Sequence, residues 1–389
     1  FIGSRSKHRF GVMRRWASLL VFTVFVGWAP VAEAGDLPPE QVSRVSALAR
    51  TFLERTATEH AAPTALSLAV GLNGDMVLAR GFGQATPGSS ADAMTLYHVG
   101  SLTKPFVAAA VLKMSTRSAQ ALTSGAVLAL DQPVSLFFHK AELWDGEAPV
   151  TVRKLLTMTS NLPNFTRRPP RDVDPWGAIS SQQLLDTLQH QAPHGLGSSF
   201  EYSNTNYFLL AALLEAVVEP EARTPRGYRE VLTDDVFLPA GMRDTRFIGE
   251  PPGEHNLAAP HFRHSRPAFN SPDWLKGSAD VVSSARDIFK WNKALMEGRV
   301  LAPELRAMMF AEWARVAPLH FYGMGWFIEH EGNRDIYFHS GTVPGYAAYN
   351  MIAVDKRSPD WISVTLLANS DAVEDLDDLA ARILDAVAR

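Results

Sequence analysis

The sequence predicts an α+β fold in which one antiparallel sheet is built from both ends of the chain. Near the amino end, two apolar runs, 66–72 and 76–82, flank Asn73-Gly74, and this pattern is a strong signal for a β-hairpin. Near the carboxyl end, the strand-like runs 347–354 and 361–368 are joined by a turn-rich segment. Because these two strand groups are so far apart in sequence, their pairing in one sheet must be non-local.

Helical patterns flank and separate the strands. Apolar residues recur at three- and four-residue steps from Pro38 to about Glu59, and a second helical pattern, Val373 to Val387, closes the chain. Four further helical patterns lie between the strand groups: Phe106–Met114, Val152–Thr159, Tyr207–Val218 and Ala285–Met296. We therefore expect one domain over residues 35–389, with a mostly helical region inserted at 115–275.

Composition excludes several classes of function. Hydrophobic residues make up 46% and charged residues 20% of the 389 residues, which is typical of a globular protein. The net charge of −4 gives no field that would attract a nucleic acid, so we expect no such partner. The absence of cysteine excludes disulfides, thiol catalysis and cysteine-based zinc sites.

The first 34 residues have the layout of a secretory signal. A basic stretch ending at Arg14-Arg15 precedes the apolar run 16–28, and Ala32-Glu33-Ala34 follows as a small-x-small cleavage site. The apolar run is short for a membrane span, which needs about 20 residues. We expect a signal peptide at 1–34, with possible non-native residues 1–12 before Met13, and a secreted or periplasmic protein without a stable membrane span after cleavage. The alternative is an uncleaved anchor.

The first candidate catalytic motif is Ser101-Leu102-Thr103-Lys104, which opens a helical pattern. Residues three apart on a helix share a face, so Lys104 would lie beside the Ser101 hydroxyl. A serine hydroxyl is a poor nucleophile until a base takes its proton. A lysine amine can be that base when burial lowers its pKa. The alternative is a serine cap followed by a solvated lysine.

The second motif is Tyr202-Ser203-Asn204. In an extended segment residues two apart point to the same side, so Tyr202 and Asn204 would face one cleft. A tyrosine near a lysine can relay protons, and an asparagine amide can hydrogen-bond a substrate amide. The alternative is a polar turn that caps the next helix.

The third motif is His339-Ser340-Gly341-Thr342, at the end of a strand-like run, 335–338. The two-residue period of a strand would put His339 and Gly341 on one face, and glycine leaves room for a substrate beside the strand. The N–H of Thr342 could then complete an oxyanion hole with that of Ser101. The alternative is a glycine-containing strand end with an incidental histidine.

The order of the three motifs, S-x-x-K then Y-S-N then H-S-G, resembles that of the serine β-lactamase and penicillin-binding protein family. The resemblance covers most of the chain. Segment 155–163 is similar to the family's LLTHTSGLP, with Asn161 where glycine is usual. Further similar segments lie at 130–134, 238–242, 282–287 and 322–326.

The resemblance implies a β-lactamase/transpeptidase-like fold and an acyl-enzyme mechanism without a cofactor. Ser101 would accept the acyl group, and Lys104 and Tyr202 would share the general-base and proton-relay role. Asn204 and the strand His339–Thr342 would position the substrate. The partner implied is a small molecule or a peptide derived from peptidoglycan.

The sequence leaves the substrate open. The chain resembles class C β-lactamases and, more closely in its motifs, D-Ala-D-Ala carboxypeptidases. Those carboxypeptidases carry an arginine shortly after Y-G-x-G that receives the substrate carboxylate, whereas here residues 326–329 read Trp-Phe-Ile-Glu and no cation follows until Arg334. D-Ala-D-Ala peptides, β-lactams and D-amino-acid amides therefore remain candidates. Alternatives are a short-chain esterase of the same family or a non-catalytic penicillin-binding scaffold.

Histidine and tryptophan residues supply three further expectations. Because an unperturbed histidine titrates at about pH 6.5, we expect activity to depend on pH in that region through His339. We interpret His255, His261 and His264, which lie beside a glutamate in a proline-flanked segment, as a solvated loop and expect no metal. Trp176 is expected to line the acyl pocket.

Overall fold

The computed structural model describes residues 37–57, 62–121, 128–138, 144–145, 148–170, 179–194, 199–217, 226–250, 256–263 and 272–388. The expected signal peptide at 1–34 lies outside these residues. So do Trp176, His255 and His264.

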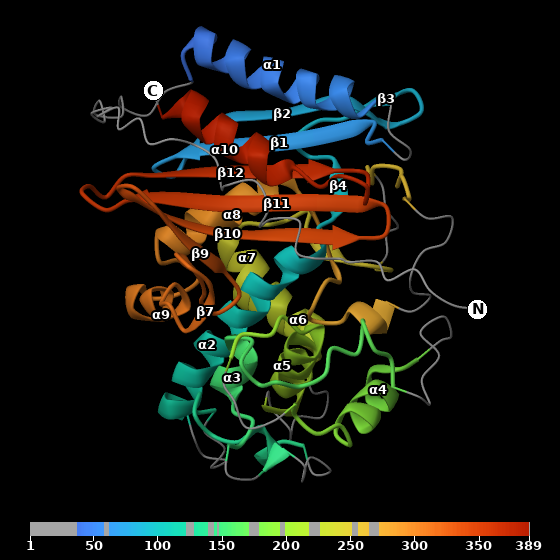
Figure 1. Ribbon diagram of the computed structural model, residues 1–389, viewed down its shortest axis with the longest axis vertical. Helices are drawn as coiled ribbons and strands as arrows, with labels where there is room; N and C mark the ends of the chain where they lie inside the picture. The colour runs from blue at the N-terminus through green and yellow to red at the C-terminus, as the bar shows by residue number, and fades with distance from the viewer. Residues whose placement is uncertain are drawn as a thin grey trace.

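A large antiparallel sheet joins the two ends of the described chain (Figure 1). Within the described residues it has nine strands in the order β3-β2-β1-β12-β11-β10-β9-β8-β7. Their bounds are β1 (Ala65–Leu72), β2 (Asp75–Thr86), β3 (Ser89–Ser90), β7 (Ala314–Ala317), β8 (His320–Tyr322), β9 (Phe327–Glu331), β10 (Arg334–Val343), β11 (Tyr346–Asp355) and β12 (Trp361–Ala368).

The centre of the sheet is the pairing of β1 with β12. Leu68 lies opposite Leu366 and Val70 lies opposite Val364, and all four side chains are fully buried. Both strands are covered on both faces, which explains why they read in the sequence as continuous apolar runs rather than alternating ones. The predicted α+β fold, with an antiparallel sheet made from both chain ends, is confirmed.

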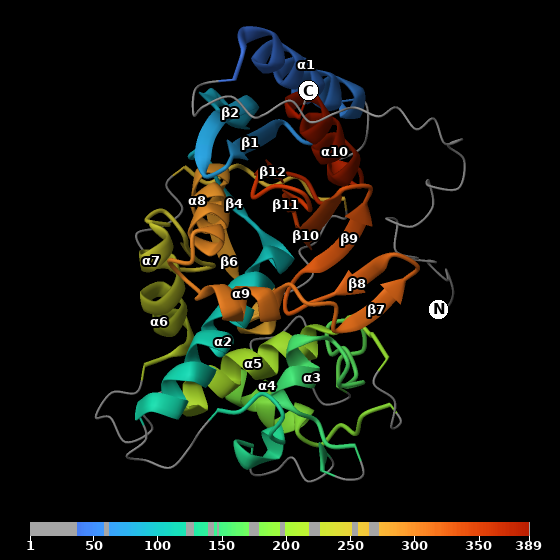
Figure 2. The ribbon, with the colours of Figure 1, turned by 90° about the vertical axis from the view of Figure 1, so that its left-hand side faces the viewer.

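Helices cover both faces of the sheet. On one face α1 (Pro39–Thr56) and α10 (Leu376–Val387) lie together (Figure 1), and their apolar sides, which include Phe52 and Ile383, form one core with the sheet. The other face packs on α8 (Ala285–Met296) and, beyond it, on the helical region (Figure 2). The terminal helices therefore seal the side of the sheet that faces away from the inserted region.

The helical region and a small second sheet complete the fold. The other helices are α2 (Thr103–Ala121), α3 (Val152–Leu156), α4 (Ser181–Leu188), α5 (Asn204–Val217), α6 (Tyr228–Leu232), α7 (Leu238–Ala240) and α9 (Pro303–Met309). Shorter turns of helix are η2 (Gly100–Leu102), η3 (Val134–Leu136), η5 (Thr233–Phe237) and η6 (Pro272–Leu275). The small sheet has the order β4 (Leu96–His98), β6 (Val281–Ser284), β5 (Arg246–Phe247).

Three local expectations are corrected by the structure. The helix expected at Val152–Thr159 ends at Leu156, because Met158 has a left-handed φ of 58° that a helix does not accommodate. The strand expected at 335–338 continues as β10 to Val343, so the third motif is itself part of the strand and fills its second half. Strands β7–β9 were not expected, because turn residues interrupt this stretch and hide the alternation.

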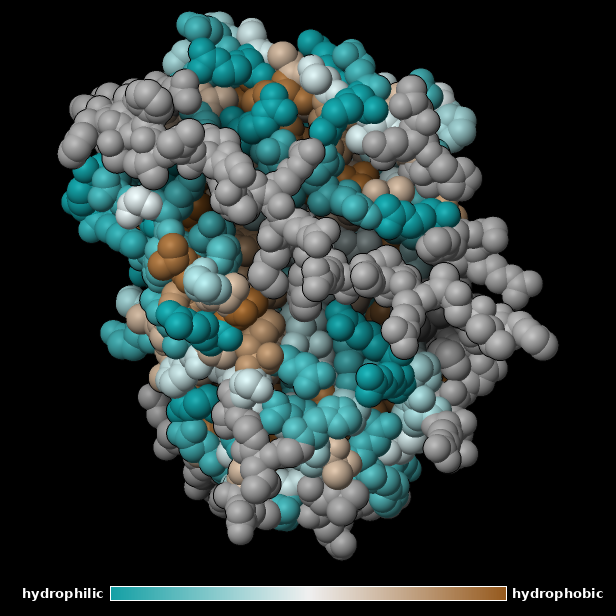
Figure 3. All heavy atoms as spheres, in the orientation of Figure 1, coloured by the Kyte–Doolittle hydropathy of each residue, from teal (hydrophilic) through white to brown (hydrophobic). Residues whose placement is uncertain are grey.

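Hydrophilic residues occupy much of the described surface over α1 in Figure 3, and hydrophobic residues reach the surface in small, separate areas. None of the described helices combines the length and the apolar character that crossing a membrane requires.

A reciprocal pair of buried amides joins α8 to the sheet. Asn292 Nδ2 donates to Asn350 Oδ1 at 2.8 Å, and Asn350 Nδ2 donates to Asn292 Oδ1 at 2.8 Å. Thr365 Oγ1 donates to Asn350 Oδ1 at 2.8 Å. Because all three side chains are buried, each amide depends on the other for its hydrogen bonds.

We predict that Asn292→Leu destabilises the fold by about 1–3 kcal/mol, because it leaves the buried amide nitrogen of Asn350 without an acceptor. Adding Asn350→Leu should recover part of this loss, since two apolar partners leave no orphaned amide. Denaturant unfolding of the wild type, both single variants and the double variant measures the coupling. If the double variant loses as much stability as the two single variants together, the two amides are not coupled and the predicted pairing is contradicted.

Candidate active site

The Ser101 backbone is shaped by the 3₁₀ turn η2, which leads directly into α2. Gly100 has a left-handed φ of 55°, and a Cβ at this position would lie 3.0 Å from the backbone nitrogen of Thr342. Glycine therefore allows the turn to lie directly against β10. The result is a partly exposed Ser101 between the start of a helix and the edge of a strand.

Lys104, one turn after Ser101, is fully buried. Its Nζ lies 3.0 Å from Ser101 Oγ and 2.9 Å from Asn204 Oδ1. It also lies 2.9 Å from the carbonyl oxygen of Ser278. Burial lowers the pKa of Lys104 well below its ordinary value, because removing water disfavours the charged ammonium. The interpretation of a solvated lysine is therefore wrong.

The second motif meets this lysine at the start of α5. Asn204 is the first residue of that helix, and Tyr202 precedes it in a segment without regular structure. The Tyr202 ring lies 4.9 Å from Lys104 Nζ. Burial raises the pKa of Tyr202, although a side-chain hydrogen bond with Ser101 and the charge of Arg167 both act to lower it. Tyr202 is thus a phenol at neutral pH and can donate a proton.

The third motif divides between the two faces of β10. His339 and Gly341 are buried on the side of the site, whereas Ser340 and Thr342 have exposed side chains. A Cβ at Gly341 would lie 2.1 Å from the carbonyl oxygen of Val99 and 3.0 Å from the Ser101 nitrogen. Glycine is therefore required for β10 to lie against the Ser101 turn, and Ser340 and Thr342 can contribute to the site only through their backbones.

His339 does not titrate where the sequence suggested. Burial lowers the pKa of His339 to about 3. Its Nδ1 lies 2.6 Å from the carbonyl oxygen of Ser340, so Nδ1 carries the proton. Its Nε2 is buried without a partner among the described residues. This low pKa contradicts the expected titration of His339 near pH 6.5, because the imidazole is then neutral across the physiological range.

Aromatic rings form a wall beside His339. Phe327, the first residue of β9, lies with its ring centroid 5.3 Å from that of His339 and stacks on Tyr202 at 6.2 Å. Phe200 lies 6.1 Å from Phe327, and Tyr322 lies 4.8 Å from Phe327. We call Phe200, Tyr322 and Phe327 the aromatic wall. Its member Phe327 belongs to the stretch 326–329, in which the sequence lacks a cation. Arg334, the next arginine, is the first residue of β10 and lies at the opposite end of that strand from His339.

Several functional groups were missed by the sequence reasoning. The Ser278 carbonyl is a backbone atom, so no side-chain pattern marks it. Thr166 hydrogen-bonds Asn204 directly, with 2.9 Å between Thr166 Oγ1 and Asn204 Nδ2. Exposed Arg167 lies close enough to Tyr202 for its charge to lower that pKa. The sequence signal that could have pointed to Thr166 and Arg167 is that they are polar residues just after the 155–163 segment.

Asp280 supports the turn that carries Ser278. Its Oδ1 accepts hydrogen bonds from the hydroxyl of Tyr228 and the N–H of Gly277, each at 3.1 Å. Burial raises the pKa of Asp280 to about 7, against the opposing charge of Arg229 and these hydrogen bonds. The carboxyl group therefore fixes the turn that presents the Ser278 carbonyl to Lys104.

Comparison with known proteins gives the family. The family model described as Beta-lactamase matches residues 48–388. The chain belongs to this family. It is 25% identical over 342 residues to penicillin-binding protein 4* of Bacillus subtilis, a match that covers 78% of this chain and 67% of that protein. The chain is also 25% identical over 328 residues to the Staphylococcus aureus protein flp, and that match covers 80% of this chain and 61% of the length of flp.

Two solved structures share the fold. A D-amino acid amidase from Ochrobactrum anthropi SV3 has a TM-score of 0.69 at 21% identity, with 89% of this chain and 98% of that chain covered. EstCE1, a hydrolase with promiscuous acyltransferase activity, has a TM-score of 0.72 at 19% identity, with 90% and 99% covered. At these identities the likeness concerns the fold alone.

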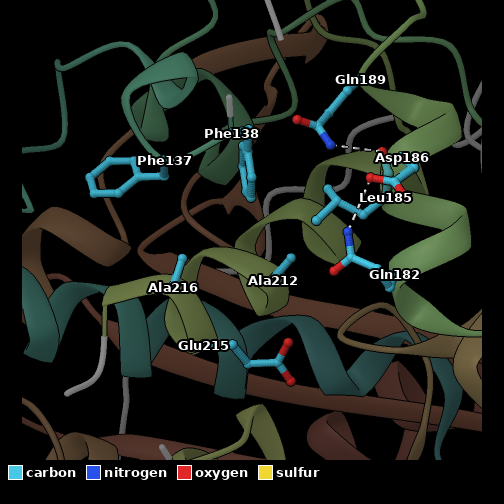
Figure 4. A pocket seen from close by; sticks show the side chains of 9 residues that line it. All are labelled: Phe137, Phe138, Gln182, Leu185, Asp186, Gln189, Ala212, Glu215 and Ala216. Atoms are coloured by element: carbon cyan, nitrogen blue, oxygen red, sulfur yellow. Dashed lines mark hydrogen bonds between the residues drawn. The ribbon is translucent and has the colours of Figure 1, made fainter. Parts of the chain in front are cut away.

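A separate cavity of about 440 Å³ lies between the η3 segment, α4 and α5 (Figure 4). Its polar groups are already engaged: Gln182 Nε2 donates to Asp186 at 3.0 Å, and Glu215 pairs with Lys276 at 2.6 Å.

No group of three or more histidine or carboxylate side chains that could hold a metal occurs in the described part of the chain. His261 instead contacts Thr64 Oγ1 at 3.2 Å.

We predict that His339→Asn leaves the pH dependence of Ser101 acylation between about pH 5 and about pH 8 unchanged, because the wild-type imidazole is neutral throughout. The absolute rate can fall through lost packing, so the test compares the shapes of the two profiles. Stopped-flow acylation measures them. An inflection near pH 6.5 that disappears in the variant would restore His339 as the titrating group.

A second prediction concerns stability and Asp280. Between the ordinary pKa of 3.8 and the folded pKa of about 7, the folded state keeps a proton that the unfolded chain has released. The wild-type free energy of unfolding therefore loses about 1–4 kcal/mol as pH rises through this window. Asp280→Asn removes that slope, so the variant should gain relative to wild type from about pH 4 to about pH 8. Thermal unfolding of both proteins across this range is the measurement, and a difference between variant and wild type that does not change with pH would contradict the prediction.

Proposed function

We propose that this protein is a serine hydrolase that cleaves amide or ester substrates through an acyl-enzyme on Ser101. One observation carries the proposal: a fully buried Lys104 whose Nζ lies 3.0 Å from Ser101 Oγ. An uncharged amine at this distance is a general base for the hydroxyl. A serine and lysine with only a structural role would not need this desolvated contact.

In the proposed reaction Lys104 takes the Ser101 proton while Oγ attacks the substrate carbonyl carbon. The backbone N–H groups of Ser101 and Thr342, which flank the contact between η2 and β10, stabilise the oxyanion. The Tyr202 phenol gives its proton to the leaving nitrogen or oxygen and regains one from Lys104. Water then attacks the acyl ester, releases the acid and restores the Ser101 hydroxyl.

The walls of the site favour a substrate without a free carboxylate. His339 is neutral, and Phe327 stacks on Tyr202 at a 9° interplanar angle where an arginine would be needed to bind an anion. An uncharged D-amino-acid amide or a short ester with an apolar group fits the aromatic wall. The names of two structural neighbours, a D-amino acid amidase and a hydrolase with promiscuous acyltransferase activity, agree with this class.

A second candidate substrate class is a D-Ala-D-Ala peptide or a β-lactam, both of which carry a carboxylate. Arg167 is the observation in its favour, since its charge reaches Tyr202. The 164–168 segment, and not β9, would then bind the carboxylate of such a substrate. The similarity to a penicillin-binding protein supports this alternative.

The test is a mass-spectrometric acylation time course of purified protein with benzylpenicillin, a D-Ala-D-Ala peptide, a D-amino-acid amide and a short-chain ester. We predict a transient adduct on Ser101 that is absent in Ser101→Ala. Lys104→Met should slow the adduct by about 10²–10⁴-fold, because it removes the base but keeps the packing volume. The substrate with the fastest turnover identifies the class. If no probe forms an adduct, the protein is a non-catalytic scaffold and the proposal is wrong.

A further inference from the structure

We propose that Asn164 and Thr166 are positioning residues that set the direction of proton transfer between Lys104 and Ser101. The inference rests on the proposed acyl-enzyme function and extends it to two side chains outside the three motifs. The inference is based on a continuous series of hydrogen bonds whose donors and acceptors can be assigned one after another. The series runs from Asn164 through Thr166 and Asn204 to Lys104.

The assignment starts from backbone groups, whose roles are fixed. The backbone N–H groups of Thr166 and Asn204 both point to one side-chain atom of Asn164, at 3.2 Å and 3.4 Å. Because a backbone N–H can only donate, this atom must be the amide oxygen. The Asn164 side chain is buried, which leaves it dependent on these protein partners for its hydrogen bonds.

The hydroxyl of Thr166 is oriented by the same oxygen. Thr166 Oγ1 lies 2.8 Å from Asn164 Oδ1, and since that oxygen can only accept, Thr166 donates its proton there. The lone pairs of Thr166 Oγ1 are then directed elsewhere, and Asn204 Nδ2 donates to them at 2.9 Å. The amide of Asn204 is thereby held with its oxygen toward Lys104.

Lys104 completes the series. A neutral amine has two N–H donors and one lone pair. Its two fixed acceptors are Asn204 Oδ1 and the Ser278 carbonyl oxygen, each at 2.9 Å. With both protons used, the lone pair is the group left for Ser101 Oγ at 3.0 Å. The amine therefore faces the nucleophile as a base and not as a donor.

The opposite orientation of Asn204 would disable the base. A flipped amide would direct its NH₂ group at Lys104, where it would donate to the lone pair. Lys104 would then have a spare N–H directed at Ser101, and the hydroxyl could not transfer its proton to it. The amide oxygen and nitrogen of an asparagine are nearly the same in shape, so Thr166 is the described side chain that distinguishes the two orientations.

The segment that carries Asn164 and Thr166 is itself fixed to α5. Phe165 N donates to Thr205 Oγ1 at 3.2 Å, and Thr205 Oγ1 donates to the carbonyl oxygen of Pro163 at 2.5 Å. The N–H groups of Arg167 and Arg168 both donate to the carbonyl oxygen of Asn164 at 3.0 Å. Thr166 is therefore held in place independently of its contact with Asn204.

The experiment replaces Thr166 with valine, which keeps the shape but loses the hydroxyl. The acylation rate of Ser101 by a short-chain p-nitrophenyl ester should fall by about tenfold to a hundredfold, as for loss of a hydrogen bond that orients a reacting group. KM for the ester should change by less than about threefold, because Thr166 does not shape the aromatic wall. Thr166→Ser keeps the hydroxyl and should restore most of the rate.

A matched control separates orientation from stability. Thr56→Val removes a buried hydroxyl in α1, on the other side of the sheet, where it hydrogen-bonds carbonyl oxygens of its own helix. It should leave the acylation rate unchanged whatever its effect on the melting temperature, because it lies outside the hydrogen bonds that lead to Lys104. If Thr166→Val acylates at the wild-type rate, or if Thr166→Ser fails to recover it, the inference is wrong and the proposed function stands. Absence of acylation in the wild type would overturn both.

Discussion

Desolvation of one amine is the constraint on which the rest of the structure depends. A buried ammonium costs several kcal/mol unless it is paired with an anion, and the described surroundings of Lys104 offer two neutral oxygens and a hydroxyl instead. The amine therefore stays uncharged, which is the condition for its use as a base. Each oxygen comes from a different part of the chain, so the helical region and the small sheet must both dock before the lysine is sealed.

Strand β10 meets the Ser101 turn through its backbone rather than through side chains. β10 lies against the Ser101 turn because Gly100 and Gly341 have no Cβ to separate them, and the strand is held in place by β11 and β9. Such a contact positions peptide N–H groups more rigidly than side-chain donors could be positioned, because the backbone of a paired strand does not change rotamer. The aromatic wall then adds shape beside His339.

Much of the fold could be predicted from the sequence, because β1, β12 and the terminal helices carry strong periodic signals. The three motifs were also recognisable, since their spacing and order constrain one another. What escaped prediction depends on burial: the low pKa of His339 follows from its position inside β10, which no local pattern specifies. The Ser278 carbonyl and Thr166 escaped for a related reason, since their roles arise only when distant segments meet at Lys104.

The pairing of β1 with β12 has a consequence for when the protein becomes active. Ser101 and Lys104 lie in the first third of the chain, but the strand that flanks them and the strands that hold it are made last. Contacts of such long sequence separation form late in folding. A partly synthesised chain would carry Ser101 and Lys104 without the strand that packs against them. The architecture thus leaves the candidate site incomplete until the last strands of the sheet have paired.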